Sequence, residues 1–433
     1  MKPGLPTTLT FWDGITLSTN AVSDICLVID SHLCGYDRPG KTGVAHDLMS
    51  SLMNWSGRHR VYYSRLEAND FVMGSEQKLK SKVREIAASQ SPAIVWITQS
   101  SAVFLMGQDT ENTAAELESE TGVQVAVIPS NVLVGDYLNG YGAAMEILSQ
   151  RVSLAASSKR PDTVAIVGYL MDRLEEDNQA NLRELRRMCG GIGEAISSIW
   201  LCGSTFAELS SVAEASHILS FPYGRRAAAI LGKRLECPVT DMELPIGLDG
   251  SVKWMRALGK LFGREKEAEA FISQELDSIV PRLERIVRST FMNRNVALAA
   301  EPNIAPGLAS YLGELGMRMR AVALRTRIQS VPTSIMDTLN VDSQSVPVIT
   351  DPTLPELESQ WRNLFDAENL DLIIATGSER TAAKSLKVPF FELGYPSYVR
   401  HALTDSPWIG FRGAIWLADA LFNLLSEWEY RKY

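Results

Sequence analysis

The sequence predicts an α/β protein made of three Rossmann-like domains with mostly parallel sheets. Short apolar runs alternate with longer amphipathic stretches along the chain, a pattern typical of parallel strands covered by helices. The step from each apolar run to the next amphipathic stretch is short, which suits right-handed βαβ units. The chain has 433 residues, which exceeds the size that a single hydrophobic core usually stabilises, so several domains are expected.

The apolar runs predicted to form strands share a short length and an enrichment in Val, Ile, Leu and Ala. They are Ile25–Asp30, Ala93–Thr98, Val123–Ile128, Thr163–Gly168, Ala195–Trp200, His217–Phe221, Asn295–Ala300, Met317–Ala323, Val346–Ile349, Leu370–Ala375 and Pro389–Leu393. Helices are predicted between them. They include Ser75–Ser89, Asn178–Cys189, Thr205–Glu214, Ala305–Leu315 and Thr381–Leu386.

Two changes in composition divide the chain. The polar stretch Ser157–Pro161 precedes a new strand, and the long charged helical stretch Arg264–Ser289 closes a second block. We therefore predict domains at residues 1–160, 161–290 and 291–433. The third domain ends in an amphipathic helix, Gly413–Trp428, whose Trp and Leu residues recur at the spacing of a packed helix face.

Composition excludes several classes of protein. The 51 acidic residues outnumber the 42 basic ones and give a net charge of −9, which argues against nucleic acid as a partner. No apolar run approaches the roughly 18–20 residues of a membrane span, and Met1–Thr10 lacks the features of a signal peptide. Five cysteines do not make a disulfide framework in a chain of this length. We expect a reduced, cytoplasmic protein.

Most catalytic motifs are absent. The sequence contains no Gly-x-Gly-x-x-Gly after a strand and no Walker A loop. It also lacks a His-Glu-x-x-His helix, a Gly-x-Ser-x-Gly turn and a paired Cys-x-x-Cys. The five histidines are too scattered along the chain to indicate a zinc site. The chain therefore shows no catalytic apparatus that is complete in itself.

The cysteine pattern is more informative. Cys26 and Cys34 bracket the first predicted strand and the loop that leaves it. Cys34 lies at the carboxyl end of that strand, where open α/β sheets place their ligands. Its thiolate suits a soft metal or an iron–sulfur cluster, and the alternative is a small buried residue. Cys26 is expected to pack in the core, and Cys189, Cys202 and Cys237 receive no role.

Several segments occur in an order that matches a known family. They are Val28–Gly35, Gly74–Leu79, Ile97–Asp109, Leu244–Leu248, Leu308–Met317, Asp371–Ser378, and the closing run Leu393–His401 with Gly410–Ala414. The closing run is the most specific, because it resembles a Gly-Phe-Pro…Asp-Arg…Gly-Tyr-Arg-Gly ending. Taken together, these segments resemble the component 1 subunits of nitrogenase and nitrogenase-like enzymes.

The resemblance implies a fold, partners and a function. Subunits of this family have three α/β domains and pair with a homologous second subunit, as αβ or α2β2, around metal clusters. Their electrons come from a separate, nitrogenase-iron-protein-like ATP-dependent reductase, which binds the ATP that this chain has no loop to hold. The implied function is a subunit of an ATP-dependent reductase complex. The alternatives are a non-catalytic scaffold for metal-cluster or cofactor maturation and a subunit that only supports its partner.

The sequence departs from the family at the metal ligands. Full members supply three cysteines from the first domain, whereas here Phe11–Ile15 occupies the region of the first and Ser101 replaces the third. Cys34 is the remaining candidate, and Cys34-Gly35 reverses the order of the family's Gly-Cys. A single cysteine resembles the second subunits of chlorophyllide a reductase and of the nitrogenase cofactor scaffold. The resemblance implies a [4Fe-4S] cluster shared with the partner, with Cys34 as the metal ligand, Asp37 as the reserve ligand and Ser101 nearby.

Overall fold

The computed structural model describes residues 7–32, 40–54, 56, 58–129, 134–154, 158–170, 172–327 and 346–431. The chain divides into two compact units. The first sheet and most of the second belong to residues 10–174 and 197–241, and the third sheet belongs to residues 1–9, 175–196 and 242–433. Each unit is described by itself below.

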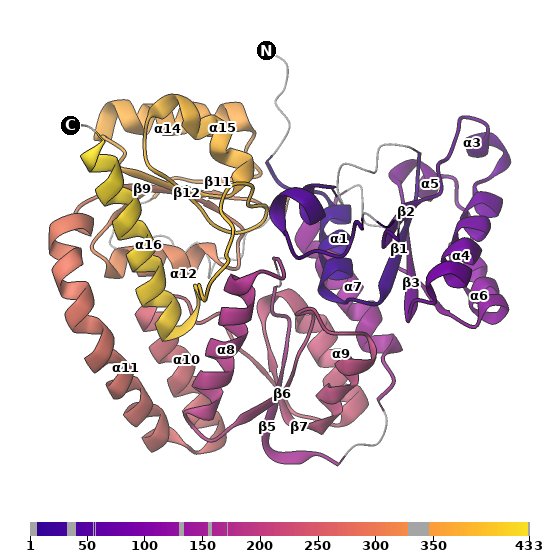
Figure 1. The fold of residues 1–433 in the computed structure, drawn as a ribbon, viewed down its shortest axis with the longest axis horizontal. Coiled ribbons are helices and arrows are strands. Elements are labelled where there is room, and N and C mark those ends of the chain that lie inside the picture. Colours follow the sequence, from indigo (N-terminus) through magenta and orange to yellow (C-terminus); the bar gives the residue numbers. More distant parts are fainter. Residues whose placement is uncertain are drawn as a thin grey trace. The chain divides into compact units, whose positions relative to one another are not determined.

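The first sheet has the strand order β2-β1-β3-β4, and every pairing in it is parallel. The strands are β1 (Ile25–Asp30), β2 (Val61–Tyr63), β3 (Ile94–Gln99) and β4 (Gln124–Val127). The helices are α1 (Phe11–Ala21), the π-helix η1 (Lys41–His46), α3 (Asp70–Met73), α4 (Glu76–Gln90), α5 (Ser101–Leu105), α6 (Thr110–Thr121) and α7 (Tyr137–Arg151). Helices α4 and α6 cover one face of the sheet, and α1 packs on the other with α7 behind it (Figure 1).

Arg60 fixes the end of α1 against this sheet. It is buried, and its Nη1 donates to the carbonyl oxygens of Thr19, Val22 and Ile25 at 2.6, 2.7 and 3.0 Å. A cation there satisfies carbonyl groups that a helix end leaves without partners. Burial lowers the pKa of Arg60 to about 10, and the group remains protonated at neutral pH.

The second sheet has the order β6-β5-β7-β8. Its strands are β5 (Arg160–Val167), β6 (Ala195–Ile199), β7 (Ala215–Ser220) and β8 (Val239–Asp241), accompanied by the 3₁₀ helices η2 (Ala207–Glu214) and η3 (Pro222–Gly224) and by α9 (Arg225–Leu235). Gly168, directly after β5, has φ +93° and lies against the Gly224 backbone, where a Cβ would meet Phe221 O at 2.4 Å. Only glycine fits this turn without strain.

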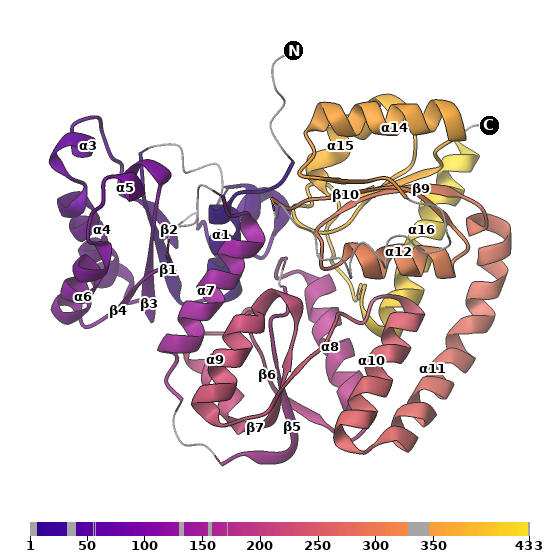
Figure 2. The ribbon, with the colours of Figure 1, turned by 180° about the vertical axis from the view of Figure 1, so that it is seen from behind.

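The third sheet has the order β11-β10-β9-β12-β13. Its strands are β9 (Asn295–Ala300), β10 (Arg318–Leu324), β11 (Val348–Thr350), β12 (Leu372–Ala375) and β13 (Phe390–Glu392). The helices of this unit are α8 (Glu176–Gly190), α10 (Gly247–Phe262), α11 (Glu265–Ile286), η4 (Val287–Phe291), α12 (Ala305–Glu314), α14 (Leu354–Glu368), η5 (Gly377–Glu379), α15 (Arg380–Ala383), η6 (Lys384–Leu386) and α16 (Gly410–Tyr430). Figure 2 shows α14 and α15 on one face of the sheet and α12 on the other. Trp361 of α14 is fully buried in the core of that first face.

The predicted α/β fold is confirmed, since the three sheets are parallel and carry helices on their faces. Every predicted strand occurs, with ends shifted by at most three residues. The sequence did not indicate β2 and β8, which are edge strands of three residues each. The predicted helix at 205–214 is the 3₁₀ helix η2. The domain boundaries near residues 160 and 290 stay a prediction.

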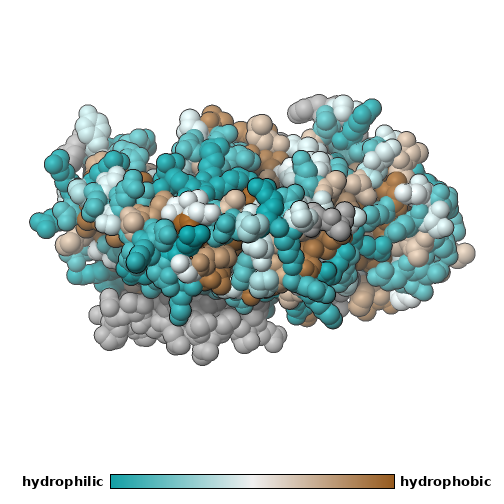
Figure 3. Space-filling model, turned by 90° about the horizontal axis from the view of Figure 1, so that it is seen from below, coloured by the Kyte–Doolittle hydropathy of each residue, from teal (hydrophilic) through white to brown (hydrophobic). Residues whose placement is uncertain are grey.

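Two further observations concern the surface. No described helix combines the length and the apolar character needed to cross a bilayer. The face drawn in Figure 3 is covered mainly by hydrophilic residues, with hydrophobic residues in small patches between them.

Candidate functional site

The carboxyl edge of the first sheet contains its topological switch point. Strand β1 lies between β2 and β3, so the chain leaves β1 toward one side of the sheet and β3 toward the other. Open α/β sheets bind ligands in the crevice at such a point. Asp30 ends β1 opposite Gln99, which ends β3, and the Ser100 N–H donates to Asp30 O at 3.0 Å.

Asp30 is the buried acid of this edge. Its Oδ2 lies 2.7 Å from Ser75 Oγ, which also lies 2.7 Å from Gln108 Oε1. A hydroxyl has one proton to donate, so both contacts are satisfied when Asp30 carries a proton or when Gln108 presents its amide nitrogen. Burial raises the pKa of Asp30, and hydrogen bonds from the Ser64 and Ser75 hydroxyls act in the opposite direction.

A Gly-Ser pair brings α4 to this carboxyl group. Gly74 has φ +96°, a conformation that favours glycine, and directs the chain from α3 into α4. Ser75 is fully buried ahead of α4, and its hydroxyl hydrogen bonds to Asp30 without capping the helix. The Gly74–Leu79 segment singled out in the sequence therefore connects a helix start to the end of β1.

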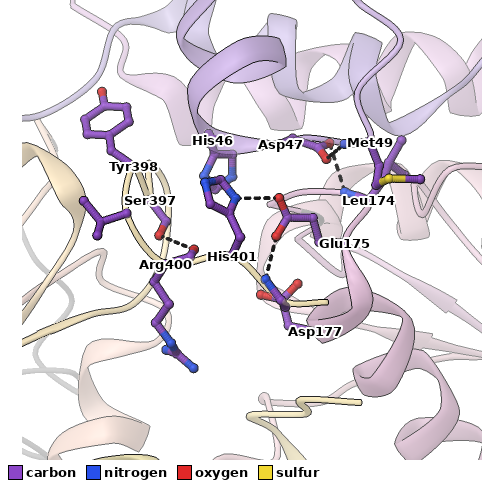
Figure 4. Close-up of polar contacts among 12 residues, drawn as sticks. His46, Asp47, Met49, Leu174, Glu175, Asp177, Ser397, Tyr398, Arg400 and His401 are labelled. Carbon is purple, nitrogen blue, oxygen red and sulfur yellow. Dashed lines mark hydrogen bonds and ion pairs between the residues drawn. The ribbon is translucent and has the colours of Figure 1, made fainter. Parts of the chain in front are cut away.

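The described residues on both sides of 33–39 are held by hydrogen bonds. Ser31 is buried, and its N–H donates to Ser64 Oγ at 3.0 Å. After η1, the buried carboxylate of Asp47 accepts from the N–H groups of Met49 and Leu174, each at 3.0 Å (Figure 4). Ser31, before residues 33–39, and Asp47, after them, are thus both anchored by hydrogen bonds.

The three predicted site residues have different outcomes. Ser101 is the first residue of α5 and half-buried, directly after the Ser100 side chain that accepts from Val103 N at 3.3 Å. It follows β3 at the same sheet edge as Asp30, and its role beside a cofactor stays a prediction. Cys34 and Asp37 lie outside the described residues, so their assignment as ligands stays a prediction.

The segment expected in place of the family's first cysteine is the start of α1. Phe11 and Ile15 are buried, and the Trp12 indole N–H donates to Gln99 O at 3.3 Å, at the end of β3. An aromatic side chain therefore contacts this edge from α1. Helix α1 and the contacts of Trp12 and Gln108 were not predicted from the sequence.

Of the four described cysteines, three are buried and one is half-buried. Cys26 is buried, as predicted, and burial raises its pKa to about 11. Cys189 and Cys237 are also buried, and burial raises the pKa of both thiols. The half-buried Cys202 thiol donates to Ile199 O at 2.9 Å. Metals bind the thiolate, which a raised pKa disfavours at neutral pH.

The described residues do not by themselves fit a metal cluster. Across them, no three His, Cys, Asp or Glu side chains converge as a metal site would require. The sheet edge supplies hydroxyl groups and one buried carboxyl, whereas a four-iron cluster takes about four ligands, mostly thiolates. Ligands from residues 33–39 or from another chain are required for a cluster at this edge.

In the other unit, Glu392 forms hydrogen bonds with the closing run Leu393–His401, the segment with the most specific resemblance to the family. Its Oε1 accepts from Ser397 Oγ at 2.9 Å, from the Tyr398 N–H and from the Val399 N–H at 3.1 Å. Its Oε2 accepts from Arg380 Nη2 at 2.6 Å. Burial acts to raise the pKa of Glu392, but these hydrogen bonds hold it below its ordinary value.

Two further buried side chains, Glu175 and Arg325, contact the same run or the residue after it. The His401 Nδ1 lies 2.8 Å from Glu175 Oε1, and the Ala402 N–H donates to Glu175 Oε2 at 2.7 Å (Figure 4). The buried Arg325 donates to Tyr395 O at 2.7 Å and pairs with Glu379 at 2.9 Å. These contacts, all within one unit, hold the loop after β13.

Comparisons with known proteins agree on one family. The chain matches the family described as nitrogenase component 1 type oxidoreductase over residues 40–426. It is 21% identical over 406 residues to the nitrogenase molybdenum-iron protein beta chain of Methanococcus maripaludis, covering 86% of this chain and 84% of that relative. It is 19% identical over 381 residues to a nitrogenase iron-molybdenum cofactor biosynthesis protein of Nostoc sp., covering 83% and 80%.

The fold is shared with solved structures. A structure described as nitrogenase Cp1 at pH 6.5 matches with a TM-score of 0.82 at 18% identity, covering 100% of this chain and 95% of that chain. At this level of identity the match shows the fold alone.

Proposed function

Because the chain belongs to the nitrogenase component 1 type oxidoreductase family, we propose that it is a subunit of a nitrogenase-like, ATP-dependent reductase complex. The family resemblance seen in the sequence is thereby confirmed. Membership implies metal–sulfur clusters and a heteromeric assembly with a partner subunit and an iron protein. The match over residues 40–426 is the observation that carries the proposal.

We propose that the complex holds a [4Fe-4S] cluster at the edge of the first sheet, shared with a homologous partner in an αβ or α2β2 assembly. Cys34 is the proposed ligand from this chain, Asp37 the reserve ligand, and Ser101 an adjacent residue. Such a cluster supplies one-electron transfer when bound. This chain's residues hold the surrounding edge, since Ser75 hydrogen bonds to both Asp30, at the end of β1, and Gln108. ATP is assigned to the separate reductase.

Exposed apolar side chains near this edge support a partner there. Val72 and Met73 of α3 are each 82% exposed, and Leu105 of α5 is 73% exposed. The segments that follow α3 and α5 are adjacent, because Ser75, two residues after α3, hydrogen bonds to Gln108, three residues after α5. Apolar side chains grouped beside a switch point are typical of an interaction surface.

The proposed ligand is tested by iron content. In the complex co-purified with its partner, Cys34→Ala is expected to remove the cluster's visible absorbance and lower the iron per complex. Asp37→Ala is expected to have the same two effects if Asp37 is the ligand in use. Cys202→Ala, which changes a cysteine outside the site, is the matched control. Iron and spectra unchanged in both Cys34→Ala and Asp37→Ala would falsify the ligand assignment.

A maturation scaffold is the second candidate function. The observation that favours it is the similarity to a cofactor biosynthesis protein over 83% of this chain. Turnover distinguishes the two, because a reductase subunit supports reduction of a tetrapyrrole or a small unsaturated substrate when the iron protein and ATP are present. A complex that binds a metal-cluster precursor and shows no turnover supports the scaffold. For either role we place the complex in the reducing cytoplasm, which suits an iron–sulfur cluster.

A further inference from the structure

A groove lies between α11 and α16, away from the first sheet and within one unit. It has a volume of about 540 Å³, in the range of pockets for small ligands. Its lining comes from the last turns of α11, the first half of α16 and residues 405–407. No metal ligand or cluster is proposed there, so the groove is independent of the proposed function.

The lining of the groove is largely apolar and includes two aromatic side chains. Ile286 of α11 and Ile415, Trp416 and Phe422 of α16 line it. The Arg400 guanidinium lies 4.5 Å from the centre of the Trp416 ring and holds the indole in place. This arrangement provides a rigid surface for an apolar or aromatic ligand body.

The acidic groups of the groove already have partners. Asp405 pairs with Arg183 at 2.6 Å, and Asp419 accepts from Asn423 Nδ2 at 3.2 Å. Asp405 is thus largely neutralised, whereas Asp419 keeps its charge because its partner is a neutral amide.

The arginines of the groove, in contrast, have donors to spare. Arg282 makes one long hydrogen bond, to Ser278 Oγ at 3.4 Å, and no carboxylate of the described chain lies within ion-pair distance of it. Arg412 reaches Glu184 only at 3.8 Å, and Glu184 already accepts two shorter bonds from Arg187. A guanidinium has five N–H donors, so both side chains have unused capacity for an anion.

We propose that the α11–α16 groove binds an amphipathic carboxylate. The carboxylate lies on Arg282 and Arg412, and the apolar body lies on Trp416 and Phe422. Two arginines without a close ion pair, one acid that is already paired and an apolar floor together favour an anionic head on an apolar body over a neutral or cationic ligand.

The test uses octanoate and its neutral analogue 1-octanol as probes in calorimetric titration of the purified full-length chain. Octanoate is expected to bind once per chain and at least about tenfold more tightly than 1-octanol, because only the carboxylate forms charge-assisted hydrogen bonds. Equal affinity for the two probes, or no saturable octanoate binding, would overturn the proposal.

Variants assign the binding to the groove. Arg282→Gln and Arg412→Gln are each expected to weaken octanoate about tenfold and leave 1-octanol unchanged. Trp416→Ala is expected to weaken both probes. Arg285→Gln is the matched control, because Arg285 is an exposed arginine of α11 that does not line the groove. Circular dichroism checks that each variant is folded.

Two further outcomes would sink the idea. Octanoate affinity unchanged in both Arg282→Gln and Arg412→Gln would place binding elsewhere. Sedimentation showing that octanoate dissociates a dimer of the chain would assign the groove to a second copy. Iron content is expected to be the same in all groove variants, so failure here and failure of the proposed cluster are distinguishable.

Discussion

The Asp30 side chain is fully buried at the end of β1, and burial raises its pKa above the ordinary value of about 3.9. A carboxyl group with a raised folded-state pKa binds its proton more tightly in the folded than in the unfolded chain. Its contribution to stability is therefore fully present below about pH 4 and is lost as the pH rises through the folded-state pKa.

Asp30→Asn tests this sign. In the native chain, the free energy of unfolding is expected to decrease as the pH rises above about 4. This decrease is expected to be absent in Asp30→Asn. Denaturant unfolding at several pH values measures it. Asp277→Asn, which changes an exposed aspartate of α11, is the control. A pH dependence identical in Asp30→Asn and the native chain would contradict the raised pKa.

At the level of single residues, the sequence predicts which side chains are buried better than it predicts which residues they contact. Cys26 was expected in the core because it lies within an apolar run, and it is buried. The contacts of Ser75 with Asp30 and Gln108 join residues 45 and 33 positions apart, and nothing in the local pattern connects them. Such contacts depend on how β1, α4 and α5 pack, which local periodicity does not specify.

Helices α1 and α7 illustrate packing at the scale of elements. They cross at two glycines, so closely that a Cβ on Gly14 would meet Tyr137 O at 1.8 Å and a Cβ on Gly140 would meet Phe11 O at 1.9 Å. Because backbone atoms occupy these positions, a methyl group forces the helices apart. The segment Phe11–Ile15, which lacks the family's cysteine, thus has a packing role.

Gly140→Ala is expected to lower the free energy of unfolding by about 2 kcal/mol or more, as overpacking of a tight contact does. Gly190→Ala is the matched control, since Gly190 is also helical and a Cβ there meets nothing within 4 Å. The control is expected to be neutral or slightly stabilising. Chemical denaturation compares the two, and equal stability would show that the helices adjust without cost.

Element type was predictable where apolar runs were long enough to show a period. Strands such as β1, β3 and β9 span six residues each and are almost entirely buried, so their sequences read as continuous apolar runs. The edge strands β2 and β8 have three residues each, and β8 is largely exposed, so neither was recognised as an apolar run. The edge strands β11 and β13 are equally short and were predicted because they lie within apolar runs.

Across the whole molecule, the alternation of strands and helices was enough to predict three parallel sheets. The position of the candidate site follows from topology, because Asp30 and Ser101 come together only once β1 and β3 are adjacent. The sequence predicted Cys34 as a ligand after β1, and that assignment stays a prediction because Cys34 lies outside the described residues. The sequence did not show that Asp30, Ser75 and Gln108 would support the edge.

The partner prediction belongs to the whole molecule. Met73 and Leu105 are exposed apolar side chains on the helices beside the candidate site, and a partner that docks there removes them from water. A charge placed in such an interface is buried without a counter-ion, which costs several kcal/mol by order of magnitude. Met73→Glu and Leu105→Glu are therefore expected to abolish co-purification of the partner and to lower the iron recovered.

The matched control is Leu403→Glu, which alters an equally exposed leucine, 80% accessible, in the other unit. Since all three side chains already face solvent, circular dichroism of the isolated chains is expected to be unchanged. Full recovery of partner and iron with both Met73→Glu and Leu105→Glu would place the interface on another surface.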